Sequence, residues 1–143
     1  MRICIDADAC PVVNLAIKIA NENGIPCVLF CDTAHIMNRE GAQTITVSKG
    51  ADSADFALVN YIRKEDIVIT QDYGLAAMCL SRGARVLHQD GMEYTNDNIE
   101  ALLLSRYESA KFRRAGGRTR GNKPRSDAQD IAFCRALRKI VMP

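Results

Sequence analysis

The amino-acid sequence predicts an α/β fold with three layers, in which a mostly parallel sheet has helices on both faces. Short apolar runs rich in β-branched residues alternate along the chain with longer amphipathic segments, as is typical of β-α-β units. The short runs are almost continuously apolar, as expected for parallel strands buried on both sides. We therefore expect right-handed crossovers between neighbouring strands.

The first half of the chain follows this alternation. Its predicted elements are a strand at residues 1–5, a helix at 11–24, a strand at 26–32, a loop or short helix at 33–43, a strand at 44–47 and a helix at 52–62. Pro11 suits the first turn of a helix, and Gly24 suits the stop. Asp52 or Ser53 can cap the second helix, which directs Phe56 toward the core.

The second half continues the pattern. Its predicted elements are a strand at residues 66–70, a helix at 72–83, a strand at 85–87, a helix from residue 95 or 96 to 112 and a helix at 126–141. Gly83 provides a helix stop, and Thr95 or Asn96 provides a capped start. The last helix is amphipathic, so we expect it to fold back on the body.

The composition fits one globular domain spanning residues 1–143. Hydrophobic residues make up 48% and charged residues 25%. No apolar run approaches the roughly 20 residues of a membrane span, and no signal peptide precedes the first strand, so we expect no membrane partner and a cytoplasmic location. The six cysteines lack zinc-site spacing and should pack as reduced apolar residues. Cys10 alone is open to another reading, since a helix N-terminus lowers a thiol pKa.

Aspartates gather where predicted strands end. They are Asp6 and Asp8 after the first strand, Asp32 at the end of the second, Asp52 and Asp55 at the start of a helix, and Asp72 after the fourth strand. Ligands of open α/β sheets bind at the carboxyl ends of the strands, so these acids should share one edge. Like charges about 4 Å apart cost on the order of 4 kcal/mol at an effective dielectric of 20, so a cation is expected among them.

Carboxylate ligands without histidine suit Mg²⁺ or Mn²⁺. Such an ion lowers the pKa of a bound water and stabilises charge on a phosphoryl group, so the pattern favours phosphodiester hydrolysis. The predicted metal ligands are Asp6, Asp8, Asp52, Asp55 and Asp72.

Several of these acids also have a structural interpretation. Asp72 precedes a helix and is a good N-cap, a role compatible with metal binding. Asp8 is a poorer cap because Pro11 lacks an N–H, and Asp55 fits an ordinary first-turn acid favoured by the helix dipole. Asp6 ends a buried central strand, where an unpaired carboxylate is costly, and is therefore the first choice as a ligand.

Other polar residues also lie near these predicted strand ends. Thr70, Gln71, Ser53 and Lys49 flank the same strand ends as the acids. The two histidines, His35 and His88, are interpreted as surface or structural residues.

A basic arm at residues 111–125 contrasts with the acidic remainder. It holds seven Lys or Arg residues and no acid, and the rest of the chain has 12 basic against 17 acidic residues. The predicted nucleic-acid-binding residues are Lys111, Arg113, Arg114, Arg118, Arg120, Lys123 and Arg125. With Phe112 as its only aromatic residue, the arm favours salt-dependent phosphate contacts that are nearly blind to base sequence. A solvated basic linker is the alternative.

Several motifs together resemble one known family. They are "DADACPVV", "KGADSADFALVNYI", "DIVITQDYGLAAMCLSRGARVL", "YTNDNIEALL" and "RRAGGRTRG". This set resembles the YaiI/YqxD family of uncharacterised bacterial proteins, which is grouped with PIN-like domains. Nucleases among the PIN-like domains cut RNA with acidic residues and a divalent metal at the carboxyl edge of a parallel sheet.

The resemblance implies a PIN-like fold and a nuclease acting on RNA or another single-stranded nucleic acid. It assigns catalytic roles to Asp6, to Asp55 or Asp52, and to Asp72. One alternative is a non-catalytic nucleic-acid-binding module that keeps the acids for structural reasons. Another is a phosphatase-like enzyme that forms an aspartyl-phosphate on Asp6.

Overall fold

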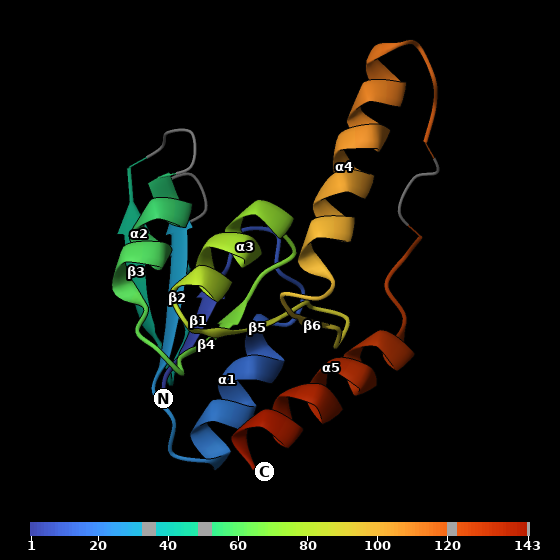
Figure 1. Ribbon diagram of the computed structural model, residues 1–143. Helices are drawn as coiled ribbons and strands as arrows, with labels where there is room; N and C mark the ends of the chain where they lie inside the picture. Colours follow the sequence, from blue (N-terminus) through green and yellow to red (C-terminus); the bar gives the residue numbers. More distant parts are fainter. Residues whose placement is uncertain (33–36, 49–52, 120–122, 143) are drawn as a thin grey trace.

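The computed structural model describes residues 1–32, 37–48, 53–119 and 123–142, and these residues contain one sheet of six strands, which can be followed in Figure 1. The strands are β1 (Ile3–Asp6), β2 (Cys27–Asp32), β3 (Gln43–Val47), β4 (Ile67–Ile69), β5 (Arg85–Leu87) and β6 (Glu93–Tyr94). Their order in the sheet is β3-β2-β1-β4-β5-β6. All neighbours pair in parallel except β5 and β6, so the predicted mostly parallel sheet is confirmed.

Strand β6 was not predicted. It has only two residues and pairs with β5 in the antiparallel direction, Val86 with Tyr94 and Leu87 with Glu93. Two residues are too few to carry a period-2 pattern, so the pairing depends on the turn that returns the chain to β5.

Five helices accompany the sheet among the described residues. They are α1 (Val13–Glu22), α2 (Ser53–Tyr61), α3 (Tyr73–Ser81), α4 (Ile99–Arg114) and α5 (Asp127–Val141). The predicted existence and order of all five are confirmed.

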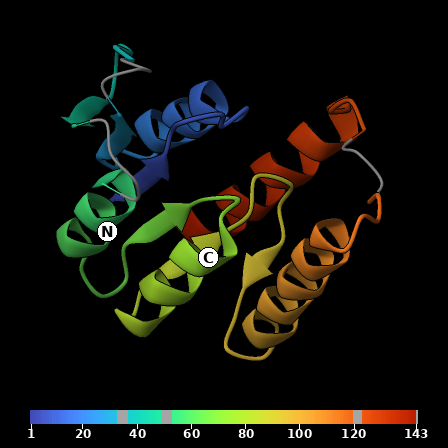
Figure 2. The same cartoon turned by 90° about the horizontal axis from the view of Figure 1, so that it is seen from above.

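The two faces of the sheet contact different helices (Figure 2). Ile3 and Ile5 of β1 pack in one apolar cluster with residues of α1 and α5. Cys4, between them in the strand, packs in a second cluster with residues of α2, α3 and the start of α4. Successive strand residues point to opposite faces, so this division produces the three layers.

Helix α1 begins at Val13, later than the predicted start at Pro11. The chain turns tightly before it: Ala9 has a φ of 58°, and the Cys10 N–H donates to the Ala7 carbonyl at 3.1 Å. Val12 is the N-cap residue, and no side chain caps this helix. A sharp turn after β1 therefore separates Asp6 and Asp8 from the helix.

The prediction that Phe56 of helix α2 points toward the core is wrong, because this residue is 58% exposed. Leu58 in the helix and Ile62 directly after it, four residues apart, are almost fully buried instead. Phe56 lies two positions from Leu58, which on a helix is close to the opposite side.

Helix α4 extends well beyond the carboxyl edge of the sheet (Figure 1). Its first residue, Ile99, is buried, whereas Leu104, Tyr107 and Phe112 are more than half exposed. The helix ends at Arg114, so the first four residues of the predicted basic arm, 111–114, are helical.

Helix α5 folds back on the body, as predicted, and it packs against α1. Phe133 and Leu137 are fully buried in the shared cluster. Before the helix, the Ser126 N–H donates to the Gln129 side-chain oxygen at 2.8 Å. Gly91, in the β5–β6 turn, has a φ of 95°, and a Cβ there would lie 2.7 Å from the Ala132 carbonyl oxygen, so this turn and α5 approach closely.

A buried ion pair joins the amino end of β1 to the residue before β4. Asp66 is only 3% exposed and accepts hydrogen bonds from the Arg2 amide at 3.0 Å and from the Arg2 guanidinium at 2.7 Å. Both strands start from this contact, which keeps their carboxyl ends in register.

The cysteines pack as predicted. Cys4, Cys27, Cys31 and Cys79 are buried, and Cys10 and Cys134 are partly buried. The alternative for Cys10 is wrong: α1 starts three residues further on, and burial raises the pKa of its thiol. No helix among the described residues is both long and apolar enough to cross a membrane.

Candidate functional site: an acidic cleft and its basic border

The carboxyl ends of β1, β2 and β4 surround a cleft of about 280 Å³, here called the acidic cleft. Its lining consists of Asp6, Asp8, Asp32, Ser53, Ala54, Asp55, Gln71 and Asp72. Four of the predicted metal ligands are thus brought together, along with Asp32. Asp52 and Lys49 lie outside the described residues. The strands run in parallel, so their ends meet at one edge, as predicted.

Thr70 joins two of these acids. Its side chain is buried, with 2% of the residue exposed, and its hydroxyl donates to Asp6 Oδ2 at 2.9 Å. The same hydroxyl accepts the backbone N–H of Asp72 at 3.0 Å. Thr70 is itself held by the Tyr94 hydroxyl, which donates to its carbonyl at 3.2 Å. One hydroxyl therefore fixes the position of Asp6 relative to the start of α3.

Asp72 is the N-cap of α3, as predicted. Its Oδ1 accepts the N–H groups of Gly74 at 2.9 Å and Leu75 at 3.2 Å. The same oxygen accepts a hydrogen bond from Arg106 at 3.2 Å. All three contacts fall on Oδ1, so capping constrains the carboxylate without engaging Oδ2 among the described residues.

Asp8 and Asp55 enter the cleft from two further segments. Asp8 is not a helix cap, because α1 starts only at Val13; its Oδ2 instead accepts the backbone N–H of Asp32 at 3.2 Å. Asp55 is the acid in the first turn of α2. Its predicted position as a first-turn acid is confirmed.

Burial and nearby acids both disfavour the ionised form of Asp6. Burial is the largest cause and, together with the charges of Asp55, Asp72 and Asp8, it raises the pKa of Asp6 to about 6, against the opposing effect of the Thr70 hydrogen bond. The described cleft lining has five aspartates and no lysine or arginine. An added cation would reduce the repulsion among these carboxylates.

The donor set suits a hard divalent ion, but the described residues do not form a complete metal cage. No group of three or more His, Cys, Asp or Glu side chains among them is arranged to hold an ion. Mg²⁺ commonly keeps several waters and takes only one or two carboxylates plus substrate phosphates. The cleft fits that mode of binding, and it does not fit a closed zinc site.

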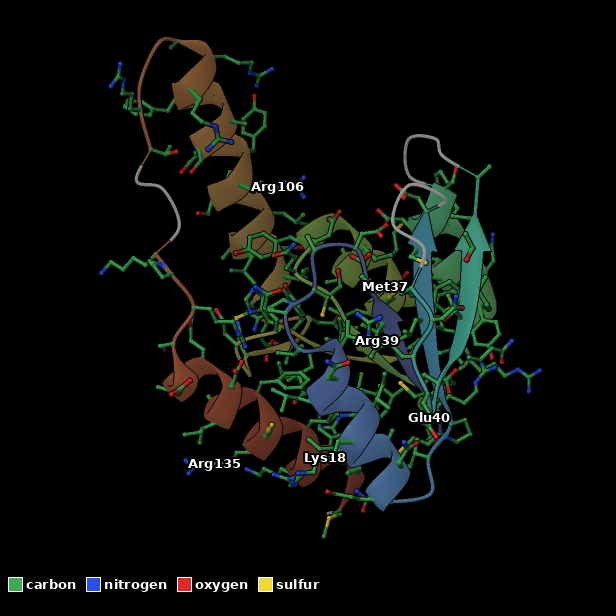
Figure 3. All side chains as sticks on the ribbon, turned by 180° about the vertical axis from the view of Figure 1, so that it is seen from behind. Lys18, Met37, Arg39, Glu40, Arg106 and Arg135 are labelled. Carbon is green, nitrogen blue, oxygen red and sulfur yellow. The ribbon has the colours of Figure 1, made fainter. Side chains whose placement is uncertain are left out.

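A second pocket of about 640 Å³ lies beside the cleft, between α3 and α4, and is here called the α4 pocket. Its lining consists of Gln71, Asp72, Tyr73, Ser105, Arg106, Ser109, Arg113 and Thr119. Gln71 and Asp72 line both spaces. Figure 3 shows Arg106 on α4, well above the bodies of α1 and α5.

Arg106 was missed by the sequence analysis. It precedes the basic arm, and no local pattern marks it as different from any other helix-surface arginine. Its contact to Asp72 spans 34 positions in the chain and depends on how α4 leaves the body. The available signal was its spacing of seven from Arg113, which places both on one face of a helix.

The predicted nucleic-acid-binding residues fall into different environments. Lys111, Arg113, Arg114, Arg118 and Lys123 are exposed, and Arg120 lies outside the described residues. Arg125 is held by the body: its guanidinium donates to Asp90 at 2.6 Å, to Asp130 at 2.7 Å and to the Gln89 carbonyl at 2.7 Å. Arg125 thus joins the turn after β5 to α5.

His88 has a structural role, as predicted. Its Nδ1 accepts the backbone N–H of Asp90 at 3.0 Å, which fixes the turn between β5 and β6. Burial lowers the pKa of His88, although the Asp90 charge acts in the opposite direction, so the ring is neutral at pH 7. His35 lies outside the described residues.

Comparison with known proteins gives consistent matches over nearly the whole chain. Residues 4–143 match the family described as "Uncharacterized BCR, YaiI/YqxD family". A UPF0178 protein of Exiguobacterium sibiricum is 48% identical over 141 residues, which cover 99% of this chain and 96% of the relative. A UPF0178 protein of Ruminiclostridium cellulolyticum is 47% identical over 143 residues, which cover 100% of this chain and 94% of the relative. A UPF0178 protein of Clostridium acetobutylicum is 44% identical over 144 residues, which cover 99% of this chain and 97% of the relative.

Proposed function

Since the chain belongs to the YaiI/YqxD family of uncharacterised bacterial proteins, whose name states no activity, we propose a function from the acidic cleft itself. The proposal is a metal-dependent hydrolase that cleaves phosphodiester bonds in RNA or another single-stranded nucleic acid. It supplies a chemical role for the acids that meet at this edge of the sheet.

The observation that carries the proposal is the convergence of aspartates from three strand ends on one small cleft. Asp6, Asp55 and Asp72 are the proposed ligands and catalytic residues, with Asp8 in support, and Asp52 stays a prediction. When bound there, Mg²⁺ or Mn²⁺ would activate a water and stabilise charge on the phosphoryl oxygens.

The protein's own groups prepare this site. Thr70 bonds both the Asp6 carboxylate and the backbone of Asp72, so it holds these two residues next to each other at the cleft. Arg106, bonded to Asp72, places a positive charge at the border of the cleft, where it can hold a phosphate next to the acids.

The test measures cleavage of labelled RNA and single-stranded DNA during a titration with Mn²⁺ or Mg²⁺. Asp6→Asn and Asp72→Asn should abolish cleavage, because each removes a negative ligand while keeping its shape. Asn is also a good N-cap, so Asp72→Asn should leave α3 intact. Asp97→Asn, an exposed acid outside the cleft, is the matched control. Wild-type protein that binds no divalent ion and cuts neither substrate contradicts the proposal.

A non-catalytic nucleic-acid-binding module is the second candidate. It is favoured by the lack of a preformed three-ligand group among the described residues, together with the exposed cations at the end of α4. In that case salt-sensitive RNA binding should survive Asp6→Asn and should be lost when Arg113, Arg114, Arg118 and Arg120 are changed to Ala.

A further inference from the structure

We propose that the α4 pocket is a phosphate-binding subsite for a single-stranded nucleic acid, with Arg106 and Arg113 on the phosphates and Tyr73 stacked on a base. The assignment deepens the proposed function and rests on it for the class of ligand. The assignment is supported by the chemistry of the pocket, by its position beside the acidic cleft and by the place of Tyr73.

The lining of the α4 pocket consists of hydrogen-bond donors suited to an anion. It offers two guanidinium groups, three aliphatic hydroxyls, a phenol and an amide. The one acid in the lining, Asp72, already accepts from Arg106 and from the start of α3. An arginine carries five N–H donors, so Arg106 keeps donors for a phosphate after this contact, and its side chain is 58% exposed.

The donors on α4 form a row along one side of the helix. Ser105, Arg106, Ser109 and Arg113 recur at the spacing of successive turns. With a rise of 1.5 Å per residue, Ser105 and Arg113 are roughly 12 Å apart along the axis, which suits an extended chain of phosphates better than a single ion. The segment after α4 returns Thr119 to the same pocket, where it accepts a hydrogen bond from Arg113 at 3.4 Å.

The α4 pocket is continuous with the acidic cleft. Gln71 and Asp72 line both, so a phosphate held by Arg106 is adjacent to the proposed metal ligands. A strand bound along α4 would therefore bring a neighbouring phosphodiester to the acids.

Tyr73 lies between the α4 pocket and a third pocket of about 520 Å³ that Gln71 and Lys123 also line. Its ring meets Tyr94 edge to face, with centroids 6.0 Å apart and planes at 66°, a contact that fixes the ring's orientation. Aromatic rings in such grooves stack on the unpaired bases of single strands, which a duplex does not expose. This residue is the reason for assigning a single strand.

The experiment measures binding of a fluorescent single-stranded RNA and DNA 10-mer, and of the matching duplex, by anisotropy in EDTA. Without metal no cleavage occurs, so binding is read separately from activity. The combined change Arg106→Ala and Arg113→Ala should weaken single-strand binding tenfold or more, and the slope of log K against log salt should become shallower by about 1.4 for two lost phosphate contacts. Tyr73→Leu should weaken binding at least fivefold, and Tyr73→Phe should retain it.

A matched control removes the same charge elsewhere. Lys18 and Arg135 lie on α1 and α5, away from α4 (Figure 3), and their combined change to Ala should alter the affinity less than threefold. An equal loss of affinity in this control variant overturns the assignment of the α4 pocket as the binding site. Duplex binding as tight as single-strand binding overturns the assignment of a single-stranded ligand.

The two proposals fail separately. Pocket variants that bind and cleave like the wild type refute the subsite and leave the hydrolase standing. Wild-type protein that binds through Arg106 and Arg113 in EDTA but cleaves nothing with Mn²⁺ supports the subsite and refutes the hydrolase.

Discussion

Replacing Asp6 with Asn should stabilise the metal-free protein while destroying its proposed activity. Burial, followed by the nearby acids, raises the pKa of Asp6 from 3.8 to about 6, so folding places its negative charge in an unfavourable environment. One pKa unit corresponds to 1.36 kcal/mol, so the ionised carboxylate costs about 3 kcal/mol near pH 7. Asn keeps a carbonyl that can accept from the Thr70 hydroxyl.

The net gain should be smaller than this cost, because the amide of Asn also loses hydration in the cleft. We expect Asp6→Asn to raise the free energy of unfolding by ~1–2 kcal/mol at pH 7.5. For a chain of this length that corresponds to a Tm increase of roughly 3–8 °C. Thermal unfolding followed by circular dichroism in EDTA measures it.

The sign of the pH dependence follows from the raised pKa of Asp6. Between about pH 4 and pH 6 the folded state binds this proton more tightly than the unfolded state, so wild-type stability falls as the pH rises through that window. The advantage of Asp6→Asn should therefore be full above pH 7 and should shrink toward zero near pH 4. A variant less stable than wild type at pH 7.5, or an advantage that is the same at pH 4, refutes the reasoning.

Two comparisons sharpen this experiment. Asp97→Asn removes an exposed carboxylate and should leave the Tm unchanged within about 1 °C. Addition of Mg²⁺ should stabilise the wild type by mass action but should not stabilise Asp6→Asn.

Three other changes should destabilise the fold. Asp66→Ala leaves the partly buried Arg2 guanidinium without its carboxylate partner and should cost about 1.5–3 kcal/mol in urea unfolding. Burial opposes ionisation of Asp66, but hydrogen bonds from Arg2 hold its pKa below the usual value, so this stabilisation is present above about pH 4 and is lost as the pH falls through the lowered pKa. Phe133→Ala empties a fully buried site under α5 and should cost about 3–5 kcal/mol. Gly91→Ala places a Cβ 2.7 Å from the Ala132 carbonyl oxygen at a positive φ and should cost about 2 kcal/mol.

For each of these three variants, one result would contradict the structural explanation. A loss below 1 kcal/mol for Asp66→Ala means that the ion pair does not hold the two strand starts together. Wild-type stability for Phe133→Ala means that α5 is not docked as described. Unchanged stability for Gly91→Ala means that the β5–β6 turn and α5 do not approach each other as closely as described.

Local sequence patterns predicted most of the fold. The strands were recognisable because parallel strands buried on both faces need continuous apolar runs, and the helices because one apolar side recurs every three to four residues. The acidic edge followed from the same reasoning, since parallel strands end together and their terminal residues must meet. The N-cap role of Asp72 was also readable, because a cap interacts only with the residues that follow it.

Other features depend on contacts between distant parts of the chain. The Thr70 hydroxyl reaches Asp6 across 64 positions, and Arg106 reaches Asp72 across 34. Arg125 looks in sequence like its basic neighbours, yet two acids and a carbonyl hold it against the body. No spacing rule connects such pairs.

Local sequence is enough to place the strands and helices and to bring acids to one sheet edge, because both depend on neighbouring residues and on the direction of parallel strands. Packing between distant segments selects the hydroxyl that orients Asp6, the arginine that approaches the acids and the cation that the body holds. The first outcome depends on the pairing of β1 with β4, and the other two depend on how α4 and α5 pack against the body.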